Sequence, residues 1–500
     1  MKKAIRRLGA LAAAGVIAVS APVAVHAEEG YTYNYDWWGD VQYSPDAYRV
    51  AGVFTAKELG LDKELSSPEG LFVSGSRVYL CDTGNNRILE LERKDQDSLE
   101  LVRIIDSFRG GTGSNTFSGP TDVAVTEDGY LYVCDRNNGR ILKLDMDLNY
   151  VLEFTQPVDA TIDQNQGFLP RKISTDSAGR VYCIATNINK GLIKYEADGE
   201  FSGFVGASKV VYDWTDYIWK KFSTKEQREA LESFVPTEYD NVYTDSEGFL
   251  YVCTTNVAEA DLDEGTAEPI RRLNMMGNDI LVRNGEWYII GDLYWGEGGG
   301  YEGPSLITDV TALDNDSYAG LDKVRGRLFV YDSQGRILFA FGGNGNMDGY
   351  FKQPAALDHM GRDLLVLDSQ DRSITIFTPT EFGSLVYQAI DQFQSGDYQK
   401  SGETWREVLT LNGNYDLAYI GIGRSLLRQK EYGQAMEYFR LKWDYDNYSK
   451  AFKQYRKEWV EDHIILVILV VLGVLCVPLG IGKLKAIKRE IDTADIFVKP

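Results

Sequence analysis

The chain has 500 residues and a formal net charge of −22 at pH 7, from 52 basic and 74 acidic side chains. This excess of negative charge repels nucleic acids and other polyanions, and argues against them as ligands. The chain has three histidines, one of them in the N-terminal segment described next, which excludes a zinc site built on several histidines.

The N-terminus has the pattern of a secretory signal. Four basic residues precede an apolar run, and small residues end that run at Ala27, before Glu28. We therefore expect residues 1–27 to be a removed signal peptide and the remainder to be exported.

Two later segments share one turn pattern, VYLCDTGNNRILEL at 78–91 and LYVCDRNNGRILKL at 131–144. A catalytic loop has no reason to occur twice, whereas a structural unit does. Strand-like segments with period-two alternation also follow six prolines: Pro68, Pro120, Pro170, Pro236, Pro304 and Pro354. Short strands repeated with turns between them predict a mainly β fold, a six-bladed propeller over residues 28–380.

These turns resemble NHL repeats, which carry Asp, Asn and Arg between the middle strands of each blade. The pattern departs at Ala185 and Thr254, where the Asp is replaced. The strand-like segment Tyr48–Phe54 resembles the N-terminal strand that completes the last blade of such rings. A structural role for the turn, through backbone hydrogen bonds of the Asp, is favoured over a directly catalytic one.

Two long intervals between repeats contain insertions. Residues 208–234 have a helical pattern, and residues 256–303 are expected to form loops. In the NHL strand order both emerge on one face of the ring, which favours a binding face. Exposed aromatic side chains there would suit a neutral sugar, whereas buried ones would only pin the insertions to the ring. These aromatic residues are Trp214, Trp219, Tyr294 and Trp295.

Charged residues just after the prolines are expected to surround the ring mouth on that face, where they bind a polar ligand or form a solvated rim. They are Glu69, Asp122, Arg171, Lys172 and Glu238. Resemblance to lactonase-like propellers implies an axial calcium ion, for which oxygen ligands are suited. The candidate ligands are Glu69, Asp82, Asp122 and Asp135. No nucleophile–histidine–acid pattern is visible in the sequence.

Four cysteines lie in the predicted strands, three of them (Cys81, Cys134 and Cys253) in the same local pattern. Cys183 is displaced by one position and is expected on the other strand face. Equivalent positions in successive repeats are too far apart for disulfides, so we interpret all four as small buried apolar residues.

Residues 381–460 have a helical pattern that repeats after 34 positions, with Tyr398, Ser401 and Trp405 matching Tyr432, Ala435 and Phe439. This spacing resembles tetratricopeptide repeats, of which about two are present, fewer than a free-standing core needs. The predicted role is to dock a peptide or partner helix, or to act as a stiff spacer.

The segment 464–482 is apolar and long enough for one membrane helix, and the tail 483–500 is rich in lysine. The basic flank places the tail in the cytoplasm and the rest outside the cell membrane.

Two functions remain open from the sequence. The first is a membrane-anchored binding or assembly protein, which resembles NHL proteins that accompany bacterial carbohydrate ABC transporters; its partners would be transporter subunits and a neutral oligosaccharide. The second is an extracytoplasmic calcium-dependent lactonase or sugar-ester hydrolase. The sequence favours the non-enzymatic function.

Overall fold

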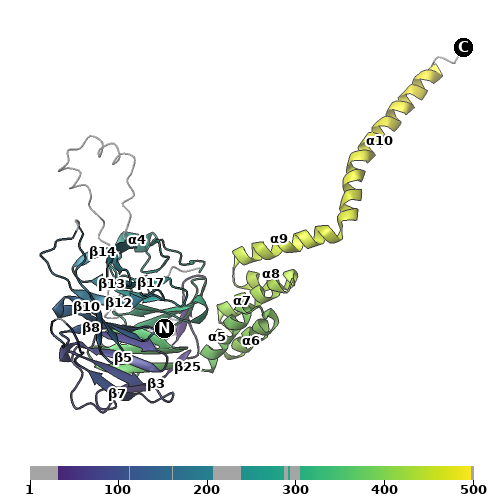
Figure 1. Cartoon of the computed structure of the whole chain (residues 1–500). Coiled ribbons are helices and arrows are strands. Elements are labelled where there is room, and N and C mark those ends of the chain that lie inside the picture. The colour runs from purple at the N-terminus through teal and green to yellow at the C-terminus, as the bar shows by residue number, and fades with distance from the viewer. Residues whose placement is uncertain are drawn as a thin grey trace, which may run out of the picture. The chain divides into compact units, whose positions relative to one another are not determined.

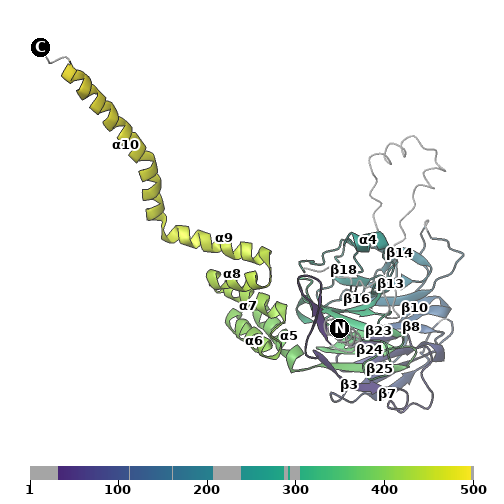
Figure 2. The ribbon, with the colours of Figure 1, turned by 180° about the vertical axis from the view of Figure 1, so that it is seen from behind.

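The structure, a computed structural model, describes residues 32–111, 113–159, 162–206, 238–285, 291–292 and 304–496. The chain divides into two compact units, with the boundary between Gly383 and Ser384. Figures 1 and 2 show a β-rich body from the first unit and a series of helices from the second. The helical insertion expected at 208–234 lies outside the described residues.

Six antiparallel sheets form a six-bladed β-propeller, which confirms the predicted fold. The first blade contains β4 (Gly70–Ser74), β5 (Arg77–Asp82), β6 (Arg87–Glu92) and β7 (Glu100–Ile105). The second contains β8 (Pro120–Val125), β9 (Tyr130–Asp135), β10 (Arg140–Asp145) and β11 (Tyr150–Phe154). The third contains β12 (Pro170–Thr175), β13 (Val181–Ala185), β14 (Ile188–Tyr195) and β15 (Phe201–Val205).

In the described residues the fourth blade contains β16 (Asn241–Thr244), β17 (Leu250–Cys253) and β18 (Ile270–Leu273). The fifth contains β19 (Ile307–Ala312), β20 (Tyr318–Asp322), β21 (Arg327–Tyr331) and β22 (Ile337–Gly342). The sixth contains β23 (Pro354–Met360), β24 (Asp363–Asp368) and β25 (Ser373–Pro379). Strand β18 and the short helix α4 (Glu259–Asp263) lie inside the range 256–303, which was expected to be loops.

The N-terminal strand β3 (Tyr48–Phe54) closes the ring. It pairs antiparallel with β25 and forms the outer strand of the sixth blade, as its resemblance to a closing strand predicts. A further hairpin of β1 (Tyr33–Tyr35) and β2 (Val41–Tyr43) extends the fifth blade through β22. Because residues from both ends of the propeller sequence share sheets, its first and last repeats are held together.

Side chains of the second strand in each blade alternate between the two neighbouring blades. In β9, Leu131 and Val133 pack in the core shared with the first blade, whereas Tyr132 and Cys134 pack in the core shared with the third. Cys183 lies in that same core and therefore faces back toward Cys134, which confirms its predicted position on the other strand face. All four propeller cysteines are buried, and none forms a disulfide.

The helical region contains α5 (Glu381–Gln394), α6 (Tyr398–Leu411), α7 (Asp416–Arg428), α8 (Tyr432–Leu441), α9 (Tyr445–Asp462) and α10 (Ile464–Ile496). Glycines let α7 approach its neighbours closely: a Cβ at Gly421 would lie 2.3 Å from Nε1 of Trp405, and one at Gly423 would lie 2.6 Å from Phe439. The matched Trp405 and Phe439 thus occupy equivalent positions on either side of α7. Helix α10 is long and apolar enough to cross a membrane, and it continues past residue 482, where the membrane segment was expected to end.

Candidate functional site

The repeated Asp–Arg turns hold the backbone of the propeller. Asp82 is fully buried; it accepts a hydrogen bond from the Ser66 N–H at 2.7 Å and pairs with Nε of Arg87 at 2.7 Å. Asp135 repeats this arrangement with the Ser118 N–H at 2.7 Å and with Arg140 at 2.9 Å. Each Asp therefore links the loop that precedes an inner strand to the turn beside it. These structural contacts use the carboxylate of the Asp.

Three other carboxylates connect the inner strands around the axis. Asp122 accepts a hydrogen bond from the N–H of Ile173 at 2.8 Å, and Asp309 accepts one from Leu357 at 2.8 Å. Asp358 accepts one from Val73 at 2.6 Å. Each of these hydrogen bonds joins one blade to the next. Because neighbouring inner strands are not paired with one another, the buried carboxylates accept the hydrogen bonds of backbone N–H groups that a paired strand would otherwise accept.

Lys172 supplies the positive charge for this buried region. Its Nζ lies 3.7 Å from Oδ1 of Asp122, and both side chains are less than a tenth exposed. Although burial lowers the pKa of Lys172, the nearby Asp122 and Asp309 carboxylates outweigh it and hold that pKa above its ordinary value. The axis therefore contains a permanent cation that belongs to the chain itself.

Burial raises the pKa of Asp309 to about 7. A carboxyl with such a pKa is suited to general base catalysis. Here, however, its oxygens accept hydrogen bonds from the backbone of Val310 and Leu357 and from the amide of Asn241, and the residue is 2% exposed. The shifted pKa therefore reflects burial in the ring and does not mark an open catalytic site.

An open hollow of about 250 Å³ is lined by residues of the second, third and fourth blades. Its lining includes Ala185 and the two residues just after Thr254, Thr255 and Asn256. These are the two repeats in which the Asp of the turn is replaced. The hollow, hereafter the Arg171 hollow, therefore opens where the repeat departs from its pattern.

The charged groups of the Arg171 hollow are already paired. Nη2 of Arg171 donates to the carbonyl oxygens of Tyr239 at 3.2 Å and Asp240 at 3.0 Å, and it lies 3.6 Å from Oδ1 of Asp240. The amide of Asn189 donates to Glu238, which also lines the hollow. The lining thus offers hydrogen-bond donors and acceptors at two contacts: the ion pair of Arg171 with Asp240 and the amide contact of Asn189 with Glu238.

A second arginine of the hollow, Arg136, pairs with Glu69: its Nη1 lies 3.9 Å from Oε2 of Glu69. The side chains of Arg136 and Arg171 are 31% and 30% exposed. With Glu238 and Asp240 they make two positive and two negative groups among the lining residues, which gives the hollow no net charge.

At the opposite ends of the inner strands, His359 contacts the Thr311 hydroxyl. The Thr311 Oγ1 and His359 Nδ1 atoms are 2.8 Å apart, and the same Nδ1 lies 3.5 Å from Oδ1 of Asp358. A catalytic relay needs the nucleophile and the acid on different ring nitrogens. Both groups meet one nitrogen here, and Thr311 is fully buried, so the trio does not form a relay.

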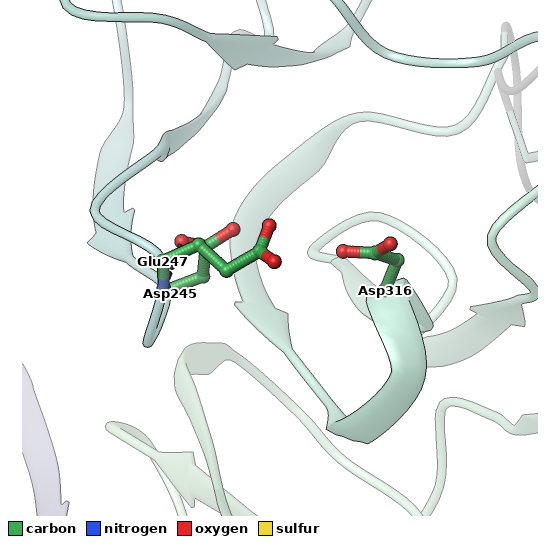
Figure 3. A group of neighbouring side chains, drawn as sticks. All are labelled: Asp245, Glu247 and Asp316. Atoms are coloured by element: carbon green, nitrogen blue, oxygen red, sulfur yellow. Dashed lines mark hydrogen bonds between the residues drawn. The ribbon is translucent and has the colours of Figure 1, made fainter. Parts of the chain in front are cut away.

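Within the described residues, one acidic trio brings its oxygen atoms within 4.8 Å of one another: Asp245, Glu247 and Asp316. Figure 3 shows the carboxylates of Glu247 and Asp316 directed toward one another from two different turns. Nη2 of Arg272 lies 2.7 Å from Asp245, 2.9 Å from Glu247 and 2.9 Å from Asp316. The guanidinium therefore occupies the position that a cation would need.

The predicted site residues separate into two groups. Asp122 and Lys172 lie at the buried axis, Arg171 and Glu238 line the Arg171 hollow, and Glu69 lies beside it. The predicted calcium ligands Glu69, Asp82, Asp122 and Asp135 are paired separately with Arg136, Arg87, Lys172 and Arg140. Because each of these acids already faces a protein cation, the set does not fit one calcium ion. The aromatic candidates Trp214, Trp219, Tyr294 and Trp295 lie outside the described residues.

Several residues of both regions did not emerge from the sequence. At the axis these are Asn241, Asp309, Asp358, Thr311 and His359, and in the hollow they are Arg136, Asn189 and Asp240. The signal that could have located the hollow is the pair of substitutions at Ala185 and Thr254, which remove the tying carboxylate from two neighbouring blades.

A family model of the NHL repeat matches residues 117–144, which include β8, β9 and the Asp135 turn. The chain is 27% identical over 150 residues to NHL repeat-containing protein 3 of Mus musculus, across 28% of this chain and 42% of that protein. It is also 27% identical over 128 residues to a probable peptidyl-alpha-hydroxyglycine alpha-amidating lyase of Caenorhabditis elegans, across 25% of this chain and 35% of that protein. The chain thus spans less than half the length of these curated relatives.

Among solved structures, a streptogramin B lyase is similar at 13% identity and a TM-score of 0.38, covering 66% of this chain and 97% of that one. A virginiamycin B lyase from Staphylococcus aureus is similar at 11% identity and a TM-score of 0.36, covering 65% of this chain and 98% of that one.

Proposed function

We propose that the chain is a membrane-anchored binding protein whose propeller takes a small uncharged polar ligand, of the neutral oligosaccharide class, in the Arg171 hollow. The observation that carries this proposal is the internal pairing of the charges that line the hollow. Ionised side chains held in pairs form strong hydrogen bonds to hydroxyl groups without requiring a ligand of opposite charge. A concave site with few convergent polar groups is the usual form of a small-molecule site.

The electrostatics of the whole chain support the same ligand class. The net charge of −22 repels anions at a distance, and the hollow adds no local positive excess to overcome that repulsion. The alternative of a calcium-dependent hydrolase has less support, because Lys172 and Arg272 already form ion pairs within the two clusters of acids that a metal ion would use.

In this proposal α10 anchors the protein, with the propeller outside the cell membrane and the lysine-rich end of α10 in the cytoplasm. The helices α5–α8 would dock a partner in the same membrane. The resemblance noted in the sequence makes subunits of a carbohydrate ABC transporter the first candidates, and a shared oligosaccharide would connect the two proteins.

Titration of the full-length protein in lipid nanodiscs with neutral glucose and xylose tetrasaccharides tests the ligand class. We expect saturable binding of at least one of them. Arg171→Gln should weaken that binding roughly 10- to 100-fold, because a hydrogen bond to a charged group contributes about 1.5–3 kcal/mol. Asn189→Ala, at an exposed position, provides a second variant that should weaken it without altering the fold.

Arg49→Gln is the matched control, since Arg49 is an exposed arginine on the outer strand β3. It should bind as the wild type does. Failure of every tetrasaccharide to bind, or equal affinity in the Arg171→Gln, Asn189→Ala and wild-type proteins, would contradict the proposal.

A further inference from the structure

The helix that precedes the membrane segment carries an exposed aromatic stripe. Tyr445, Phe452, Tyr455 and Trp459 are 54%, 43%, 42% and 45% exposed. With the half-buried Tyr448 they follow a spacing of three and four residues along α9, which places them on one side of the helix. Aromatic side chains of this size normally lose most of their exposure to water, so the stripe needs a covering surface.

The other sides of α9 carry basic and acidic side chains, and among the basic ones Arg456 lies next to the stripe. Lys450, Lys453, Arg456 and Lys457 form the middle of α9, and the Arg456 guanidinium lies 5.8 Å from the centroid of the Phe452 ring. An amphipathic helix with aromatic residues on one side and Lys or Arg on the other is the pattern of a helix that lies in a membrane interface. Tyr and Trp in particular prefer that layer.

The position of α9 in the chain identifies the covering surface. Helix α9 ends at Asp462 and α10 begins at Ile464, with His463 between them at a non-helical φ of −111° and ψ of 18°. At about 1.5 Å per residue, Trp459 lies within roughly 8 Å of the first residue of the membrane helix. That distance is about the thickness of the headgroup layer.

We propose that α9 lies along the membrane surface, with its aromatic stripe in the boundary between lipid headgroups and acyl chains and with Arg456, beside the stripe, at the phosphates. If α9 instead continued along the membrane normal, Phe452 would stand about 18 Å from the start of α10, outside the headgroup layer, and the stripe would face water. This inference goes beyond ligand binding by the propeller and does not depend on it.

Lipid-dependent quenching of single fluorescent labels tests this placement. The four propeller cysteines are buried and should not react, so a Cys476→Ser background permits one label at a chosen position in the full-length protein. The vesicles contain phosphatidylcholine and phosphatidylglycerol with a nitroxide near the headgroup. Labels on Phe452→Cys and Tyr455→Cys should be quenched at least about twofold more strongly than labels on Gln454→Cys and Lys457→Cys, which lie on other sides of α9.

The native Cys476, exposed in α10, provides the reference for insertion, because a deeply placed nitroxide should quench its label. Equal quenching at all four α9 positions would overturn the proposal. So would a blue-shifted but unquenched label on the stripe, which would show that a second copy of the chain covers it. A Cys476 label that no lipid nitroxide reaches would also overturn it, since α10 would then lie outside the bilayer.

Discussion

At the axis of the propeller, the ammonium group of Lys172 faces two buried carboxylates, those of Asp122 and Asp309. Buried charges are stable only when they are paired, so removal of this cation leaves acids that the interior cannot solvate. The same reasoning explains why the turn acids Asp82 and Asp135 each have an arginine partner.

Substitution of Lys172 by Met keeps most of the side-chain volume and removes its charge. We expect the free energy of unfolding to fall by about 3–5 kcal/mol, the usual cost of breaking a buried ion pair. Urea unfolding of the purified protein measures this change. Lys94→Met, at an exposed ion pair, should change it far less, because water already solvates both charges, and Asp122→Asn added to Lys172→Met should restore part of the loss. A loss no larger for Lys172→Met than for Lys94→Met would contradict the pairing.

The titration of Asp309 predicts a pH dependence. Its pKa is about 7 in the folded chain and about 3.9 in an unfolded one. Between these values the folded state binds the proton that the unfolded state has lost, so the free energy of unfolding should fall as pH rises from about 4 to about 7. The slope from this one group is at most about 1.4 kcal/mol per pH unit.

Asp309→Asn removes that contribution. Chemical unfolding at several pH values should show a wild-type stability that falls relative to the variant as pH rises through this window. Two parallel stability profiles would show that Asp309 does not titrate there.

At the scale of elements, the sequence repeat predicted the positions of the blades better than the identity of the residues at the axis of the ring. The strand pattern and the proline spacing located the blades, and Tyr48–Phe54 was identified as the closing strand. The axial positions depend on where each inner strand begins after its proline. Asp122 and Lys172 lie two residues after Pro120 and Pro170, whereas Asn241 and Asp309 lie five residues after Pro236 and Pro304.

In the fourth and fifth blades, the chain between the proline and the axial residue is therefore longer than in the second and third. Counting two residues from Pro236, as in the second and third blades, gives Glu238, which lines the hollow. It does not give Asn241, which lies at the axis. Register within a strand depends on pairing between strands, and the local sequence does not contain that information. For the same reason the Arg171 hollow, which combines residues from three blades, could not be assembled from one motif.

The close packing of α7 predicts an asymmetry between two glycines of the helical region. A Cβ at Gly421 would lie 2.3 Å from Trp405, whereas a Cβ at Gly433 in α8 would meet nothing within 4 Å. Gly421→Ala should therefore destabilise the helices by about 1–3 kcal/mol through overpacking. Gly433→Ala should be neutral or stabilising by up to about 1 kcal/mol, because Ala favours the helix.

Thermal unfolding followed by circular dichroism at the helical band compares these two variants. Because the helices and the propeller are separate compact units, the β-sheet signal should unfold at the same temperature in both. Equal helix stability in the two variants would contradict the close approach of α7 to Trp405.

At the scale of the whole molecule, the order of parts follows from the sequence: a β ring, then helices, then one apolar helix. The chemistry of the ring does not, because the sequence cannot distinguish acids that would bind calcium from acids that pair with a lysine or arginine of the chain. Only the positions of Lys172 and Arg272 in the fold distinguish them. The chain therefore provides its own cations at both acidic clusters, and in the proposed function its ligand binds elsewhere.

The most direct test of that claim is the metal content of the full-length protein, purified without chelator, together with its melting temperature before and after EDTA. We expect less than stoichiometric calcium and an unchanged melting temperature, because the side chains of Lys172 and Arg272 do not leave with a chelator. One tightly bound calcium per chain, with a melting temperature that falls on EDTA treatment and recovers on adding calcium, would contradict the account and favour the hydrolase.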